Sequence, residues 1–130
     1  GNKKKSISGV KVSNATIKKG KFTVTVSASG SKLKSFAKDK GWNSIYVDTS
    51  LAGKSKKKLK VKSATLKIDG KTVKTIKNPA LTPDPGKSDA FTQVMVINTW
   101  NSYAQKKFSA SSCTKMPKKS ISVTISGKLK

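Results

Sequence analysis

The chain has no arginine, no histidine and no glutamate, and these absences exclude much of ordinary enzyme chemistry. Its formal net charge of +24 comes from 29 lysines set against five aspartates. Without histidine or glutamate, the usual proton shuttles and most sets of metal ligands are missing. We therefore expect a protein that is not an enzyme, and we predict no metal site and no cofactor.

Cysteine and long apolar runs are equally scarce. The single cysteine, Cys113, cannot form an internal disulfide, and it fits either a reducing compartment or a secreted bacterial domain that never used disulfides. No histidine is present to activate it, so we expect a buried or bystander thiol. The longest apolar run covers only residues 94–97, far short of the roughly 20 residues that cross a bilayer. We expect no membrane span.

The chain does contain short runs in which apolar and polar residues alternate. In the run 21–29, Phe22, Val24 and Val26 alternate with hydroxyl side chains, which is the period of a strand with one buried face. The run 90–100 is apolar on both faces at its centre, which predicts a central strand covered on each side. Further strands are predicted at 6–12, 43–48, on both sides of 69–70, and at 120–129. Segment 32–40 fits a helical turn or an irregular connector, and 101–110 is expected to continue or pair with the strand before it.

The dipeptide Asp69-Gly70 lies between two alternating runs, which is a strong signal for a β-hairpin. A two-residue loop there sets Leu66 opposite Val73. Before this hairpin, the apolar positions switch from odd to even numbers near 62–63. We therefore predict a β-bulge or strand break at that point.

Seven or eight short strands with almost no helix predict an all-β fold, a single antiparallel β-sandwich domain over residues 1–130. Residues 1–5 are expected to form a disordered basic N-terminus. The runs FTVTVSASGS (22–31), ATLKIDGKTVKTIK (64–77) and FTQVMVINTW (91–100) resemble strands of immunoglobulin-like and fibronectin-like modules of bacterial secreted and surface proteins. The resemblance implies an immunoglobulin-like sandwich and an extracellular or cell-surface location in bacteria. It brings no function with it, because such folds host many functions.

The lysine excess creates a positive field that attracts anionic polymers. Without arginine, bidentate reading of bases is disfavoured, whereas non-specific nucleic-acid binding, teichoic acid and acidic polysaccharide all remain open as partners. A lysine coat that only keeps the sandwich soluble is the simpler alternative. The predicted polyanion site is the densest run of lysines, namely Lys54, Lys56, Lys57, Lys58, Lys60 and Lys62.

Lysine is absent from residues 88–105, and burial of 94–97 explains only part of this gap. The gap continues into a segment where aromatic rings stand beside amides. Sugar sites use this combination, because the ring face stacks on the sugar and the amides bond its hydroxyls. Packing of the aromatic rings in the core or at a sheet edge is the competing explanation. The predicted glycan-binding residues are Trp42, Tyr46, Trp100, Asn101, Tyr103 and Gln105.

From these features we expect a non-catalytic adhesion or structural module that binds anionic envelope or extracellular polymers through its lysine-rich surface. Two alternatives stay open. One is a carbohydrate-binding module that uses exposed aromatic side chains. The other is a filament or scaffold subunit that assembles when its N-terminal strand pairs with the open sheet edge of a neighbour.

Overall fold

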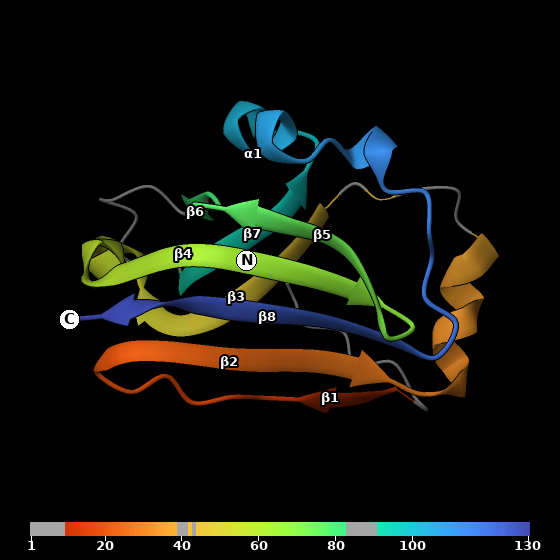
Figure 1. The fold of residues 1–130 in the computed structure, drawn as a ribbon, viewed down its shortest axis with the longest axis horizontal. Helices are drawn as coiled ribbons and strands as arrows, with labels where there is room; N and C mark the ends of the chain where they lie inside the picture. The colour runs from red at the N-terminus through yellow and green to blue at the C-terminus, as the bar shows by residue number, and fades with distance from the viewer. Residues whose placement is uncertain (1–9, 39–41, 43, 83–90) are drawn as a thin grey trace.

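The structure is a computed structural model that describes residues 10–38, 42, 44–82 and 91–130. Within them the chain forms a five-stranded sheet in the order β1-β2-β8-β4-β5 and a three-stranded sheet in the order β3-β7-β6 (Figure 1). All the strand pairs are antiparallel, so the predicted all-β class with antiparallel pairing is confirmed. The strands are Lys11–Ser13 (β1), Gly20–Ser29 (β2), Ser44–Ala52 (β3), Leu59–Ile68 (β4), Lys71–Lys77 (β5), Leu81–Thr82 (β6), Phe91–Asn98 (β7) and Ser120–Leu129 (β8).

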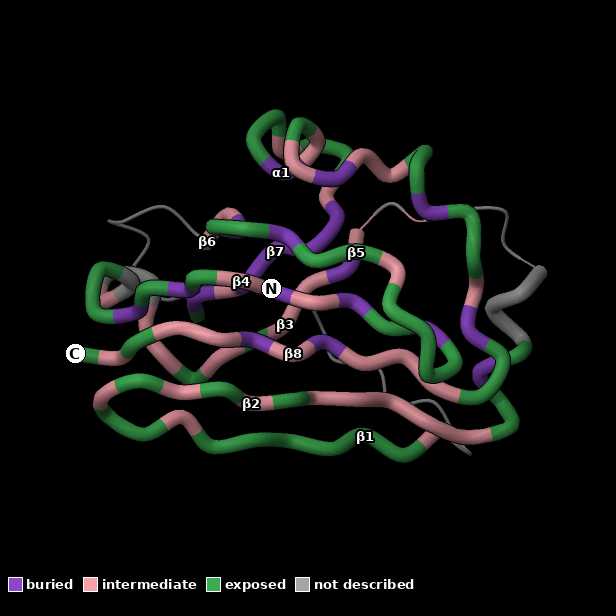
Figure 2. The backbone as a smooth tube through the Cα atoms, viewed as in Figure 1, coloured by how far each residue is buried: buried purple, intermediate pink, exposed green. Residues whose placement is uncertain are grey.

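The larger sheet buries one face because apolar residues alternate with polar ones in each strand, and the apolar residues of neighbouring strands lie opposite one another. Val24 of β2 lies opposite Ile125 of β8, which in turn lies opposite Ala64 of β4. These three side chains belong to the core or pack against it, whereas Thr23 and Thr25 are exposed. Figure 2 shows the buried positions along the middle of β4 and β8, with β1 exposed along its length. The larger sheet therefore has one apolar face and one polar face.

The smaller sheet supplies the other side of the core. Its central strand, β7, has four consecutive buried residues, 94–97, and pairs with β3 on one side and β6 on the other. Val94 and Val96 share one core cluster with Leu66 and Val123 of the larger sheet. The prediction of a central strand covered on both faces is confirmed, and burial explains why this strand contains no lysine.

The hairpin between β4 and β5 has the predicted two-residue loop. Asp69 and Gly70 both have positive φ, 51° and 81°, which a type I′ turn requires. The predicted register is wrong beyond the turn, because a shift between Leu66 and the next residue sets Leu66 opposite Lys74. The pairing skips Val73, so β5 contains a β-bulge at this residue. A second bulge, the one predicted near 62–63, is confirmed by a register shift between β4 and β8.

The segment after β7 forms a helix, so the predicted strand at 101–110 is wrong. Helix α1, Ser102–Lys107, begins at Asn101, whose side-chain oxygen accepts a hydrogen bond of 3.0 Å from the backbone N–H of Ala104. Asparagine is a favoured N-cap because it satisfies an N–H that has no partner within the helix. Ala104 and Phe108 are buried beneath the helix. α1 thereby covers the end of β7.

Three short 3₁₀ segments complete the described chain: η1 (Ser31–Lys38), η2 (Gly53–Lys58) and η3 (Ala110–Ser112). The first matches the helical-turn alternative predicted for 32–40. The second holds most of the lysine run from the predicted polyanion site. The predicted N-terminal tail at 1–5 and the first part of the strand predicted at 6–12 lie outside the described residues.

Candidate functional site

Three lysines from three strands lie side by side on the outer face of the larger sheet. Lys128 of β8 pairs in register with Lys21 of β2 on one side and with Lys60 of β4 on the other. All three are exposed. Because neighbouring strands lie about 4.8 Å apart, this line of residues is about 10 Å wide at the backbone. We call Lys21, Lys128 and Lys60 the basic row.

More lysines surround the basic row at the same end of the sheet. The backbone N–H of Lys130 donates a hydrogen bond of 2.8 Å to the carbonyl of Lys58, so Lys130 lies beside η2. Figure 1 shows the C-terminus, the coil of η2 and the start of β2 at one side of the molecule. The exposed lysines next to the basic row in sequence or by this contact are Lys18, Lys19, Lys57, Lys58, Lys62 and Lys130.

The structure regroups the lysines that the sequence singled out. Lys60 joins the basic row, and Lys57, Lys58 and Lys62 flank it. The side chains of Lys54 and Lys56 lie outside the described residues. Sequence reasoning missed Lys21 and Lys128, which come from β2 and β8. Each lysine occupies an outward-facing position in the alternating pattern of its strand. The two come together only because β2 and β8, which are far apart in the sequence, pair in the sheet.

The basic row lies away from both aspartates of the described residues. Asp69 lies in the β4–β5 turn, at the other end of the sheet. Asp48 is on β3 in the smaller sheet, where its carboxylate accepts a hydrogen bond of 2.9 Å from the amide of Gln93. Like charges directly opposite one another destabilise a sheet. Among the described residues, no aspartate lies in the basic row to offset this repulsion.

Rows of hydroxyl side chains continue the outer face beyond the basic row. Thr23 and Ser126 share a hydrogen bond of 3.0 Å, and Ser126 pairs in register with Ser63. In the next row, Thr25 and Thr124 share one of 2.8 Å. A hydroxyl in such a pair keeps further hydrogen-bonding capacity, since it has one donor and two acceptor positions. The face beside the basic row is therefore polar and suited to hydrogen bonding.

Two aromatic side chains are exposed where β7 leads into α1. Trp100 is 76% exposed and Tyr103 is 46% exposed. The Tyr103 hydroxyl donates a hydrogen bond of 2.8 Å to the carbonyl of Asn78. The Lys107 ammonium lies 5.4 Å from the centroid of the Tyr103 ring, which is a cation–π distance. We call Trp100 and Tyr103 the aromatic shelf.

The other predicted glycan residues have structural roles. The side-chain oxygens of Asn101 and Gln105 accept hydrogen bonds from the N–H groups of Ala104 and Ala110, so these amides organise α1 and the turn after it. Each amide still has an NH₂ group that can donate. Trp42 packs against the core, and its indole N–H donates to the carbonyl of Lys115 at 3.1 Å.

Tyr46 is half-buried on β3, opposite Met95. Of the predicted glycan residues, Trp100 and Tyr103 present the most open rings. The predicted set therefore divides into an exposed pair and residues that organise the surrounding structure.

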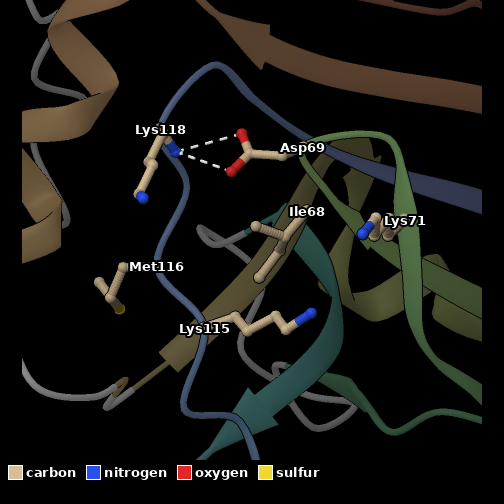
Figure 3. Close-up of a pocket in the computed structure, with 6 residues that line it drawn as sticks. All are labelled: Ile68, Asp69, Lys71, Lys115, Met116 and Lys118. Atoms are coloured by element: carbon tan, nitrogen blue, oxygen red, sulfur yellow. Dashed lines mark hydrogen bonds between the residues drawn. The ribbon is translucent and has the colours of Figure 1, made fainter.

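A hollow of about 360 Å³ lies at the opposite end of the larger sheet from the basic row. Figure 3 shows Asp69 turned toward the backbone of Lys118. Its carboxylate accepts hydrogen bonds from the N–H groups of residues 118–120 at 2.7–3.1 Å. These bonds lower the pKa of Asp69 because they favour the charged carboxylate. The lining residues are Ile68, Asp69, Lys71, Lys115, Met116 and Lys118.

Cys113 is the one cysteine and is only 2% exposed. Burial raises the pKa of its thiol, which disfavours the thiolate needed by a nucleophile. The described part of the chain holds no cluster of three or more histidine, cysteine, aspartate or glutamate side chains suited to a metal ion.

Comparison with known proteins found no matching family model, no matching curated protein and no matching solved structure. Among the described residues, no helix has the length and apolar character to cross a membrane.

Proposed function

We propose that this protein is a non-catalytic binding module for anionic polymers and that the basic row is its main contact. The observation that carries the proposal is the in-register pairing of Lys128 with both Lys21 and Lys60. Repulsion within such a row is unfavourable in the free protein. A polyanion laid across the row converts this repulsion into attraction and releases its own counterions.

The choice of lysine supports a polymer in preference to a base sequence. A lysine ammonium is a compact point charge with rotatable donors, and it binds phosphate, carboxylate or sulfate with little demand on geometry. Reading of base edges favours the rigid fork of arginine, which the chain lacks. Teichoic acid, acidic polysaccharide and non-specifically bound nucleic acid are all members of the proposed ligand class.

We further propose that the module acts outside a bacterial cell or on its surface, as the resemblance noted from its strands implies. The immunoglobulin-like fold is part of that resemblance and remains a prediction. In the constant-type domain of that fold the last strand shares a three-stranded sheet with the third and sixth strands, whereas β8 lies between β2 and β4 in the larger sheet.

The proposal is tested by removing the basic row and measuring retention on an anionic resin. Replacing Lys21, Lys60 and Lys128 with glutamine takes the formal net charge from +24 to +21. We expect this triple variant to elute from heparin or teichoic-acid resin at clearly lower salt than the parent. The slope of log affinity against log salt should become shallower by about two to three, since each lost contact removes released counterions.

A matched control makes the same charge change elsewhere. Lys11, Lys67 and Lys74 are exposed residues on β1, β4 and β5, outside the basic row. Replacing these three with glutamine also gives a net charge of +21, three below the +24 of the parent, and should leave most of the retention intact. Equal losses in both triple variants would mean that net charge alone causes retention, and the basic row would then have no special role.

Two other functions each have one supporting observation. The 76% exposure of Trp100 favours a carbohydrate-binding module. The 65% exposure of Val12 on the edge strand β1 favours a filament or scaffold subunit that pairs strands with a second copy. Sedimentation of the protein at high concentration tests the filament function, because a strictly monomeric species contradicts it.

A further inference from the structure

We infer that the basic row and the aromatic shelf are two parts of one binding track for a linear acidic polysaccharide. The inference rests on the proposed function and names its ligand class. An acidic polysaccharide has both flat sugar rings, which suit aromatic side chains, and regularly spaced carboxylate or sulfate groups, which suit lysines. The two surfaces come from segments far apart in the sequence.

Two hydrogen bonds through Asn78 connect the surfaces. The Asn78 N–H donates to the carbonyl of Lys62 at 2.9 Å, and the Asn78 carbonyl accepts from the Tyr103 hydroxyl at 2.8 Å. Asn78 has a positive φ of 51°, a conformation that asparagine tolerates better than most residues. Lys62 is two residues beyond Lys60 on β4. Tyr103 of the aromatic shelf is therefore linked to β4, the strand of Lys60, through the backbone of Asn78.

Lysines accompany this path. The strands β2, β8, β4 and β5 are consecutive neighbours in the larger sheet, and together they span about 14 Å. Lys77 of β5 is exposed and pairs with Ser63, one step beyond the basic row. At the far end, Lys107 lies over the Tyr103 ring. Figure 1 shows α1 beyond the β5 edge of the larger sheet, so the path leads from the sheet face to the helix.

The chemistry of the track separates an acidic polysaccharide from a polyphosphate and from a neutral glycan. A polyphosphate has no ring to stack on Trp100, so it would use the lysines alone. A neutral glycan has no charge for the basic row, so it would use the aromatic shelf alone. Sugar hydroxyls also match the hydroxyl row formed by Thr23, Ser126 and Ser63, which lies between the basic row and the rest of the sheet face.

The test measures binding of the 130-residue chain to three probes by isothermal titration calorimetry. The probes are a linear oligouronate, inorganic polyphosphate of matched charge, and a neutral cello-oligosaccharide. The variant is Trp100→Ala, and its matched control is Phe91→Ala, because Phe91 is 59% exposed at the opposite end of β7. Thermal melting confirms that each variant folds.

We expect Trp100→Ala to weaken oligouronate binding about tenfold, the scale of a lost stacking contact, and to leave polyphosphate binding unchanged. Phe91→Ala should change neither. The triple lysine variant of the basic row should weaken both anionic probes, and the neutral probe should bind weakly to all forms. These results together support the track.

Other outcomes separate this inference from the proposed function. If polyphosphate binds and Trp100→Ala leaves oligouronate binding intact, the track is overturned and anionic-polymer binding stands. If the neutral probe binds as tightly as the oligouronate, the track is again overturned and a carbohydrate-binding module is favoured. If neither anionic probe binds, the proposed function and the track are both overturned.

Discussion

Asp69 is the residue that fastens the β4–β5 hairpin to the strand at the centre of the larger sheet. Its carboxylate accepts hydrogen bonds from three consecutive backbone N–H groups at the start of β8. Its own N–H donates to the carbonyl of Ser120 at 2.8 Å. The sequence signal of Asp69-Gly70 predicted the turn, but this second role depends on where β8 begins, which no local pattern reveals.

Replacing Asp69 with asparagine should destabilise the protein at neutral pH. Asparagine tolerates the positive φ at this position, so the substitution tests the charge with little added backbone strain. The pKa of Asp69 is lowered in the folded state. Its contribution to stability is therefore complete above 3.8, the ordinary pKa of an aspartate, and is lost as pH falls through the folded-state pKa. Thermal melts across acidic pH measure this contribution.

The difference in melting temperature between the parent and Asp69→Asn should be constant at pH values well above 3.8 and should shrink below that pH. A difference that persists unchanged at the lowest pH would show that the carboxylate charge is not the cause.

At the scale of the elements, the bulge in β4 depends on a glycine in β8. Gly127 pairs with Phe22 on one side and Val61 on the other, next to the register shift between β4 and β8. A side-chain carbon at Gly127 would overlap the carbonyl of Lys60 and come within 3.0 Å of the Val61 Cα. A glycine within a strand often marks such a close backbone approach.

Gly127→Ala should therefore lower the free energy of unfolding by about 1–3 kcal/mol, the usual cost of overpacking. Urea unfolding measures the change. Ser122→Ala, on the polar face of the same strand, is the matched control and should change stability little. Equal stability of Gly127→Ala and the parent would mean that the strands separate at the bulge without cost.

The elements that could be predicted from sequence were those with local signals. The strands at 21–29 and 120–129, the 69–70 turn and the bulge near 62–63 follow from alternation and turn chemistry. The register near Leu66 was wrong because a bulge in β5 has no separate signature in a run of lysine, threonine and valine. Helix α1 was missed because six residues give little periodicity, although the Asn101 cap was a readable signal.

At the scale of the whole molecule, the charge is the dominant feature. The formal net charge is +24, and exposed lysines are distributed over both ends of the larger sheet. Self-repulsion of this kind destabilises a compact state and is weakened by salt. For the candidate site, the sequence alone reveals the excess of lysine. It does not reveal the basic row, because the row forms only when β2, β8 and β4 pair.

The melting temperature should rise as salt increases from about 0.01 M to about 0.1 M, a range over which the Debye length falls from about 30 Å to about 10 Å. Differential scanning calorimetry measures this change. The rise in melting temperature should be smaller in the triple variant of the basic row than in its matched control. Both variants lose three positive charges, but only the basic-row variant loses lysines that lie directly opposite one another in the sheet. A melting temperature that falls with added salt would contradict net repulsion.

The central position of β8 has a consequence for biogenesis. β8 is synthesised after the seven other strands of the described residues, yet it hydrogen-bonds to β2 and β4. The side chains of Thr25 and Thr124 meet across 99 positions of sequence. Until β8 leaves the ribosome, the larger sheet is divided into two halves with unpaired edges. Non-local pairing of this kind is slow to form. The larger sheet therefore cannot close while the earlier strands are being made, and the mutual repulsion of their lysines would help to keep them from aggregating during the wait.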